Sequence, residues 1–145
     1  MKRKILVAYD GSELCKIALM EAEIQANAVN EAEVHVLAVV CHASIATSFP
    51  TVAIDMEKAE AEKLQAELGK IKANFVGENV AVYPKVLIDH LARNAGRAIV
   101  EYAEEKEMDL IIIGSRGLGN VRGKILGSVS NQVVQRADCH VLVIK

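Results

Sequence analysis

The segment at residues 114–128 has the residue types that a phosphate-binding loop needs. It carries five of the nine glycines of the chain, and glycine lets a backbone approach a ligand closely. The apolar run 109–114 predicts a buried strand before it, and residues 128–138 predict a short helix after it. Backbone N–H groups at the start of such a helix attract phosphate. The alternative interpretation is a flexible surface loop.

Two common phosphate motifs do not fit this segment. A Walker A loop reads G-x4-G-K-[ST], but Gly119 and Gly123 enclose only three residues, and Ile125 stands where the motif has a hydroxyl residue. The dinucleotide fingerprint G-x-G-x-x-G ends on a glycine where this loop has Arg122, and it belongs after the first strand of a sheet. The pattern that is present reads G-x2-G-x9-G-S and is formed by Gly114, Gly117, Gly127 and Ser128.

A second polar segment, Asp10-Gly11-Ser12, follows the first apolar run of the chain. An Asp-Gly pair favours a tight turn, and Ser12 is a good N-cap for the helix that its downstream periodicity predicts. We expect its apolar residues at helical spacing to face the sheet, namely Leu14, Ala18, Ala22, Ala26 and Val29.

The elements that must position these two segments alternate between strands and helices. Apolar runs predict five strands, at residues 4–10, 32–40, 79–88, 109–114 and 140–145. Helical periodicity predicts four helices, beginning near residues 12, 52, 94 and 128. Glu and Lys cover one face of the helix at 52–75, as expected for a solvated surface.

This alternation predicts an α/β fold, a single doubly wound domain over residues 1–145 with helices on both faces of a parallel sheet. Right-handed crossovers give the strand order 3-2-1-4-5. Ligands of such sheets bind beyond the carboxyl ends of the strands, where the order reverses. Both polar segments follow strands that meet at that point, so we expect them to form one site.

The composition narrows the classes of partner. The net charge of −2 gives no basic face for nucleic acid, and no apolar run reaches the ~18 residues of a membrane span. Three cysteines without a CxxC pair indicate neither a zinc site nor a disulfide framework and favour a reduced, cytoplasmic protein. Cys41 is the thiol expected near the site, either as a reactive group or as a small buried filler. The four histidines match no metal-ligand spacing.

Three fragments together resemble the universal stress protein family. They are ILVAYDGS at 5–12, DLIIIGSRG at 109–117 and GSVSNQVVQRADCHVLVIK at 127–145. The G-x2-G-x9-G-S pattern is similar to the nucleotide-binding signature of that family, and the resemblance covers almost the whole chain. It implies a fold like that of the adenine nucleotide alpha hydrolases, and a homodimer in which the last strand pairs with its copy.

The resemblance also implies a site for ATP, with or without Mg²⁺, or for AMP or ADP. By position, Asp10 would lie near the adenine or ribose, Val39 near the adenine, and the signature residues near the ribose and phosphates. Helix N–H groups at Ser128 and Val129 agree with a phosphate there, and any of Arg116, Arg122 and Lys124 could add its positive charge. The candidate nucleotide-binding residues are Asp10, Gly11, Ser12, Val39, Gly114, Ser115, Arg116, Gly117, Gly127, Ser128, Val129 and Ser130. No catalytic residue and no metal ligand is expected.

Two serines of the last predicted helix have further interpretations. Ser128 is a natural N-cap, which is compatible with phosphate binding. Ser130 is either a phosphorylation acceptor or an ordinary serine of an early helical turn.

Two places depart from the family pattern. Arg93 and Ala95 stand where a Gly-x-Pro stretch is common, which predicts another path for residues 85–94 or an arginine near the site. His140 stands where the family often has proline.

The leading functional prediction is a regulatory protein that binds an adenine nucleotide and signals through a dimer to an unidentified protein partner. One alternative is an enzyme with slow ATP hydrolysis or self-phosphorylation, although the sequence shows no Walker B pattern and no nucleophile paired with a histidine. Another alternative is an interaction or protective protein that works without nucleotide.

Overall fold

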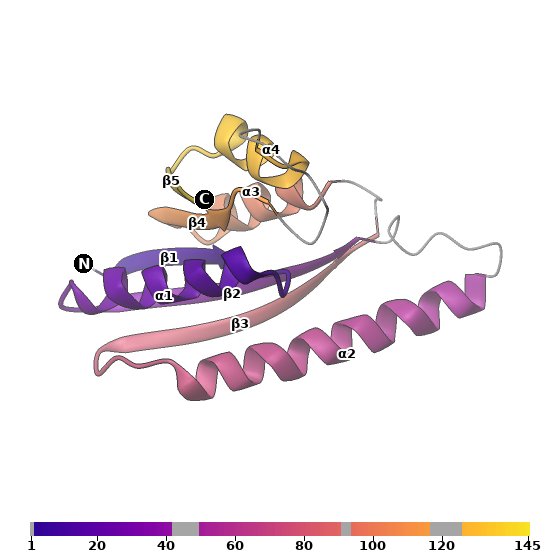
Figure 1. Ribbon diagram of the computed structural model, residues 1–145, viewed down its shortest axis with the longest axis horizontal. Helices are drawn as coiled ribbons and strands as arrows, with labels where there is room; N and C mark the ends of the chain where they lie inside the picture. The colour runs from indigo at the N-terminus through magenta and orange to yellow at the C-terminus, as the bar shows by residue number, and fades with distance from the viewer. Residues whose placement is uncertain (1, 42–49, 91–93, 117–125) are drawn as a thin grey trace.

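Five parallel strands form one sheet in the order β3-β2-β1-β4-β5 (Figure 1). The computed structural model describes residues 2–41, 50–90, 94–116 and 126–145. The elements in chain order are β1 (Arg3–Ala8), α1 (Glu13–Asn27), β2 (Ala32–Cys41), α2 (Pro50–Asn74), β3 (Val80–Asp89), α3 (Ala95–Glu105), β4 (Leu110–Gly114), α4 (Ser128–Arg136) and β5 (His140–Ile144). The parallel sheet, its strand order and its helices on both faces confirm the fold class predicted from the sequence.

β1 lies at the centre of the sheet, where the strand order reverses. Its Val7 pairs with Val36 of β2 on one side and with Ile112 of β4 on the other. Because side chains alternate along a strand, Ile5 and Val7 pack in the core beneath α1 and α2, whereas Leu6 packs beneath α3 and α4. All three have no exposed surface, as expected for a strand covered on both faces. The carboxyl ends of β1 and β4 therefore lie side by side.

Small side chains let α1 pack closely on the sheet. Ala18, Ala22 and Ala26 recur at helical spacing and are at most 1% exposed. The helix ends at Asn27, because the chain turns there towards β2. Val29, which the periodicity placed on the inward face, lies beyond that end and is exposed. The inward prediction for Val29 is therefore wrong.

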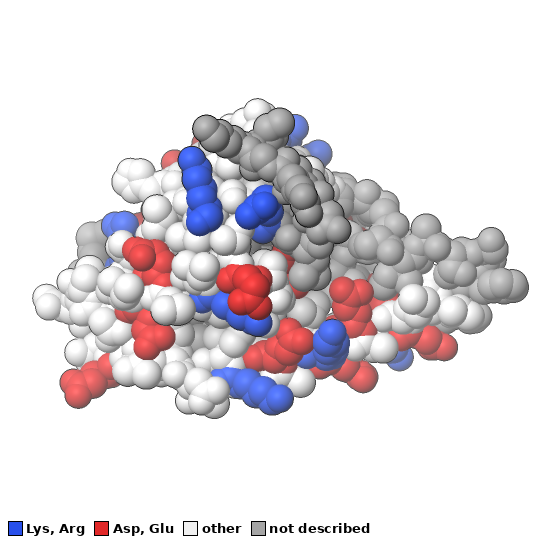
Figure 2. Space-filling view, in the orientation of Figure 1, with Lys and Arg blue, Asp and Glu red and all other residues white. Residues whose placement is uncertain are grey.

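The edge strand β3 contains Pro84 in its interior, opposite Val36 of β2. An edge strand tolerates proline because only one of its sides must form a ladder of hydrogen bonds. α2 packs on this side of the sheet through Leu68, which is 1% exposed, with Leu64 and Ile71 partly buried beside it. The outward surface of α2 carries interspersed acidic and basic side chains (Figure 2).

Within the described ranges, no helix has both the length and the apolar composition that a membrane crossing requires.

Candidate functional site

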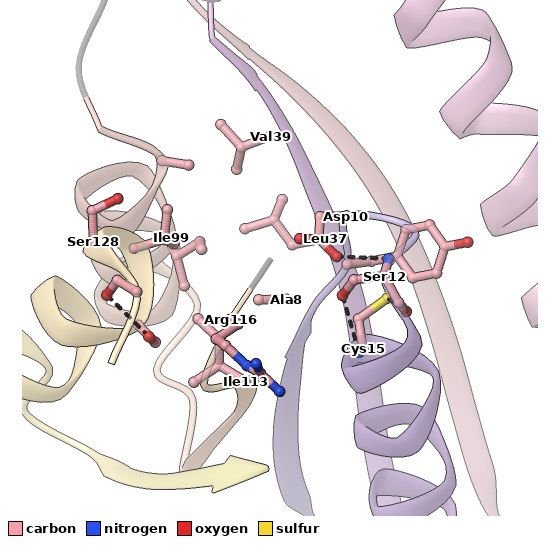
Figure 3. A pocket seen from close by; sticks show the side chains of 16 residues that line it. Ala8, Asp10, Ser12, Cys15, Leu37, Val39, Ile99, Ile113, Arg116 and Ser128 are labelled. Atoms are coloured by element: carbon pink, nitrogen blue, oxygen red, sulfur yellow. Dashed lines mark hydrogen bonds between the residues drawn. The ribbon is translucent and has the colours of Figure 1, made fainter. Parts of the chain in front are cut away.

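A cavity of about 300 Å³ opens at the carboxyl ends of β1, β2 and β4. In Figure 3, Asp10 and Ser12 lie on its α1 side, and Ile99 and Ser128 lie on the side of α3 and α4. The candidate nucleotide-binding residues in its lining are Asp10, Ser12, Val39, Gly114, Arg116, Gly127, Ser128, Val129 and Ser130. The structure thus brings both polar segments of the sequence to one cavity.

Two candidates among the described residues do not line the cavity. Gly11 and Ser115 lie next to lining residues but are absent from the wall itself. Gly117 lies outside the described residues, as do Arg93, Arg122 and Lys124, which were also expected near the site. Ala95, which stands where the family pattern has proline, is in the lining.

The turn between β1 and α1 is closed by its own side chains. The Ser12 N–H donates to Asp10 Oδ1 at 2.9 Å, and the Cys15 N–H donates to Ser12 Oγ at 3.3 Å. Ser12 is therefore the N-cap of α1, as predicted. Gly11 has a φ of +84°, a conformation that side-chain-bearing residues rarely adopt. Gly11 thus shapes the turn, and the turn holds the Asp10 carboxylate at the cavity.

Close packing at the end of β4 explains Gly114. A Cβ built on Gly114 would lie 2.8 Å from the Cβ of Leu14 on α1, which is closer than carbon atoms approach in proteins. Gly127, at the other end of the loop, is less restricted: its Cβ would lie 3.3 Å from Ser115 O, a tight approach that a small shift relieves. Contacts with Leu14 and with Ser115 O therefore favour glycine at these two described positions.

Hydrogen bonds to Ser115 close the two ends of the loop onto each other. Ser115 O lies 2.7 Å from the Gly127 N–H donor and 2.8 Å from the Ser130 Oγ donor. The Ser115 N–H donates to Ile144 O of β5 at 2.7 Å. Ser130 is 2% exposed, and its hydroxyl also lies 3.1 Å from Gly127 O. This burial and bonding favour a loop-closing serine at position 130 over a phosphorylation acceptor.

The N-terminus of α4 has no side-chain cap, and the prediction that Ser128 caps it is wrong. Gly127 occupies the N-cap position, and Ser128 is the first helical residue. The bond from Gly127 to Ser115 fixes the extended backbone one residue earlier than side-chain preference suggested. Ser128, Val129 and Ser130 therefore present the positive end of the helix dipole to the cavity.

An apolar wall completes the cavity. It consists of strand-end residues and one residue of α3, namely Ala8, Leu37, Val39, Ile113 and Ile99 (Figure 3). Of these, only Val39 was predicted. The signal for Leu37 was its spacing of two residues from Val39, since such residues share one face of a strand. Apolar side chains of this kind line the ligand pockets of many proteins.

Two further lining residues, Tyr9 and Cys15, were also missed from the sequence. The Cys15 Sγ donates to Ser12 O at 3.0 Å, and burial raises the pKa of this thiol, which keeps it protonated and unreactive. The Tyr9 hydroxyl donates to Glu67 Oε2 at 3.0 Å, and burial, followed by Glu67, raises the pKa of Tyr9. Cys41, the thiol expected near the site, is absent from the described lining.

The described lining combines few charged groups with its apolar wall. Its described residues include one carboxylate, Asp10, the guanidinium of Arg116 and no histidine. In the ranges that the structure covers, no group of three histidine, cysteine or acidic side chains is arranged to hold a metal ion. The apolar wall, the carboxylate and the helix N-terminus together match a ligand with an aromatic ring, a polar middle and an anionic end.

Comparisons with known proteins extend over the whole chain. A model of the universal stress protein family matches residues 1–145. Universal stress protein YxiE of Bacillus subtilis (strain 168) is 31% identical over 149 residues, which cover 100% of both chains. The solved structure of hypothetical protein MJ0577 has a TM-score of 0.88 at 27% identity, covering 100% of this chain and 96% of the other.

Two solved universal stress proteins of the same fold are nucleotide complexes. One, in complex with cAMP, has a TM-score of 0.60 at 22% identity, covering 99% of this chain and 96% of the other. The second, from Archaeoglobus fulgidus and in complex with dAMP, has a TM-score of 0.65 at 20% identity, covering 100% of this chain and 98% of the other. At these identities the likeness establishes a shared fold.

Proposed function

Because the chain belongs to the universal stress protein family, we propose that it is a regulatory protein that binds an adenine nucleotide between the ends of β1 and β4. One observation carries the proposal: a single cavity combines an apolar wall with a helix N-terminus that lacks a side-chain cap. The complexes of related folds with cAMP and dAMP support an adenine nucleotide as the ligand.

The geometry supports one orientation of that nucleotide. The adenine packs against the apolar wall beside Leu37 and Val39, and the Asp10 carboxylate accepts hydrogen bonds from the adenosine part. The phosphates bind at the N-terminus of α4 near Gly127, and Arg116 adds a positive charge to the cavity lining. ATP, with or without Mg²⁺, ADP and AMP share these three parts, and the signature residues bind them in this proposal.

We also propose a homodimer in which β5 pairs with its copy and passes the nucleotide signal to a protein partner. β5 is an edge strand of the sheet, and residues 141–144 are only partly buried in one copy of the chain. Edge strands present backbone donors and acceptors that a second strand can bind. A pairing of this kind would also cover those apolar side chains.

Calorimetric titration of AMP and Mg-ATP into nucleotide-stripped protein tests the proposed ligand. We expect saturable binding by the natural chain and its loss in Gly127→Arg, because the arginine side chain would enter the phosphate end of the cavity. Gly69→Arg is the matched control, since Gly69 lies on α2 with no atom near its added Cβ. Thermal unfolding of all three proteins separates loss of binding from loss of folding.

Two results would contradict the proposal. The first is an absence of binding by the natural chain at millimolar nucleotide, with no nucleotide released from the purified protein. The second is equal binding by Gly127→Arg and Gly69→Arg. Phosphate release measured in the same samples addresses the enzymatic alternative, which steady turnover well above that of Gly127→Arg would favour.

A further inference from the structure

A partly buried hydrogen bond joins the cavity to α2. The Tyr9 N–H donates to Leu37 O at 2.8 Å, which fixes the backbone of Tyr9 beside β2 at the cavity. Its side chain is 8% exposed and belongs to the core that α1 and α2 cover. The hydroxyl at the end of that side chain donates to Glu67 Oε2 of α2 at 3.0 Å. Tyr9 therefore contacts the candidate site with its backbone and α2 with its side chain.

Packing alone does not explain this pair of polar groups. A phenylalanine would fill the space of the Tyr9 ring, and the neighbouring Leu68 already buries α2 against the sheet. A phenol and a carboxylate that leave water lose hydration, and their mutual hydrogen bond offsets that loss. Burial and Glu67 raise the pKa of Tyr9, so the hydroxyl remains a donor at neutral pH. The pair thus fixes one position of α2 relative to Tyr9.

The position of Tyr9 also determines where the next turn lies. Asp10 follows directly in the chain, and its carboxylate accepts the Ser12 N–H that closes the turn. A displacement of Tyr9 moves both Asp10 and Ser12, which line the cavity. Conversely, a ligand that holds Asp10 in one place also holds Tyr9, and through the hydroxyl it holds Glu67.

We infer that Tyr9 and Glu67 are positioning residues. Their hydrogen bond holds the turn at residues 10–12 in the position that nucleotide binding requires, and it couples nucleotide binding to the position of α2. This inference rests on the proposed function. α2 is a helix of 25 residues with a charged outward surface (Figure 2).

Two measurements on one set of variants test the inference. Calorimetry gives the Kd of AMP and Mg-ATP for the natural chain, Tyr9→Phe, Glu67→Leu, Glu67→Gln and the double variant Tyr9→Phe/Glu67→Leu. Hydrogen–deuterium exchange of α2, with and without Mg-ATP, reports whether occupancy reaches Glu67. Tyr83→Phe is the matched control, because it removes a hydroxyl from a side chain that is 46% exposed on β3.

We expect Tyr9→Phe and Glu67→Leu each to weaken binding about fivefold, the effect of one hydrogen bond. The double variant should bind no more weakly than either single variant, because both remove the same bond. Glu67→Gln keeps a carbonyl acceptor and should restore binding to within about twofold. Mg-ATP should slow exchange around residue 67 in the natural chain and in Glu67→Gln, but not in Tyr9→Phe.

The failures of the two proposals are distinguishable. If the natural chain binds neither AMP nor Mg-ATP, the proposed function and the inference both fall. If the natural chain binds and Tyr9→Phe binds equally well, with the same slowing of exchange in α2, the inference alone is overturned. A variant that lowers Tm but keeps both the affinity and the exchange response assigns the pair to core stability, which also overturns the inference.

Discussion

Two strand-to-helix connections meet at the cavity, and the helices that follow them differ in how their first backbone N–H groups are capped. After β1, the side chains of Asp10 and Ser12 accept the N–H groups of Ser12 and Cys15. After β4, Gly127 has no side chain to cap α4, and Ser115 O closes the loop instead. α1 is therefore capped from within the chain, whereas α4 leaves backbone donors for a ligand. This difference places the phosphates at α4 and the adenosine near α1 in the proposed complex.

α3 follows the pattern of α1. Its N-cap, Asn94, accepts the Gly96 N–H through Oδ1 at 2.7 Å. A capping side chain competes with a bound anion for the same N–H groups. The glycine at the start of α4 thus lowers the intrinsic stability of that helix end, and the same absence of a cap makes the end available for binding.

Giving α4 a side-chain cap like that of α1 should have the largest effect, and this effect should be on nucleotide affinity. In Gly127→Asp the carboxylate would accept the first N–H groups of α4 and repel phosphate, so we expect AMP and Mg-ATP to bind about a hundredfold more weakly. The unfolding temperature should change little, because the new cap offsets the close approach to Ser115 O. Calorimetry and thermal unfolding measure both quantities. Gly69→Asp is the charge-matched control, and equal affinity of the two variants would refute the contrast between the helix ends.

Removing the Ser130 hydroxyl, which closes the loop, should have the next largest effect, and this effect should be on the free energy of unfolding. Ser130→Ala deletes a buried hydroxyl whose bonds to Ser115 O and Gly127 O hold the loop ends together. We expect a loss of about 1–2 kcal/mol in the free energy of unfolding, measured by chemical denaturation. Ser128→Ala serves as the control, because Ser128 lies two residues away and is exposed. This variant should change the free energy of unfolding by less than about 0.5 kcal/mol. Equal stability of the two variants would contradict the loop-closing role.

Removing the cap of α1 should affect stability more than binding. Ser12→Ala deletes the oxygen that accepts the Cys15 N–H, and an N-cap of this type contributes about 1 kcal/mol. The affinity for AMP should fall by less than about threefold, since the α4 end holds the phosphate. Denaturation and calorimetry on the same sample measure the two effects. A loss of affinity as large as that of Gly127→Asp would show that α1 also binds the phosphate.

A pH dependence should arise away from both turns. His35 is 8% exposed, the Tyr102 hydroxyl lies 2.8 Å from its Nδ1, and burial lowers the pKa of His35. The unfolded chain then binds more protons than the folded chain, so stability should fall as pH drops below about 6.5. Denaturation at pH 7.5 and 5.5 measures the slope. His35→Gln should flatten this slope, whereas His140→Gln, at an exposed position, should leave the slope unchanged. Equal slopes in the two variants would contradict the assignment of the pH dependence to His35.

Local signals in the sequence predicted the fold and one of the two turns. The Asp-Gly pair and Ser12 determine the turn after β1 by themselves, because every bond in it joins neighbouring residues. The N-cap of α4 was misplaced by one residue, since the distant bond from Gly127 to Ser115 O decides it. The apolar wall was mostly missed, because residues such as Ala8 and Ile113 belong to continuous apolar strands, in which no local signal separates the cavity lining from the rest of the core. Gly117 remains a prediction.

An NMR titration tests the contrast between the two helix ends most directly. In a ¹H–¹⁵N spectrum of nucleotide-stripped protein, AMP should shift the amide signals of Ser128, Val129 and Ser130 saturably and by more than that of Cys15. Inorganic phosphate should shift the same three signals at higher concentration. The opposite pattern would contradict the central claim: a saturable shift at Cys15 with none in α4, or no saturable shift at either helix end.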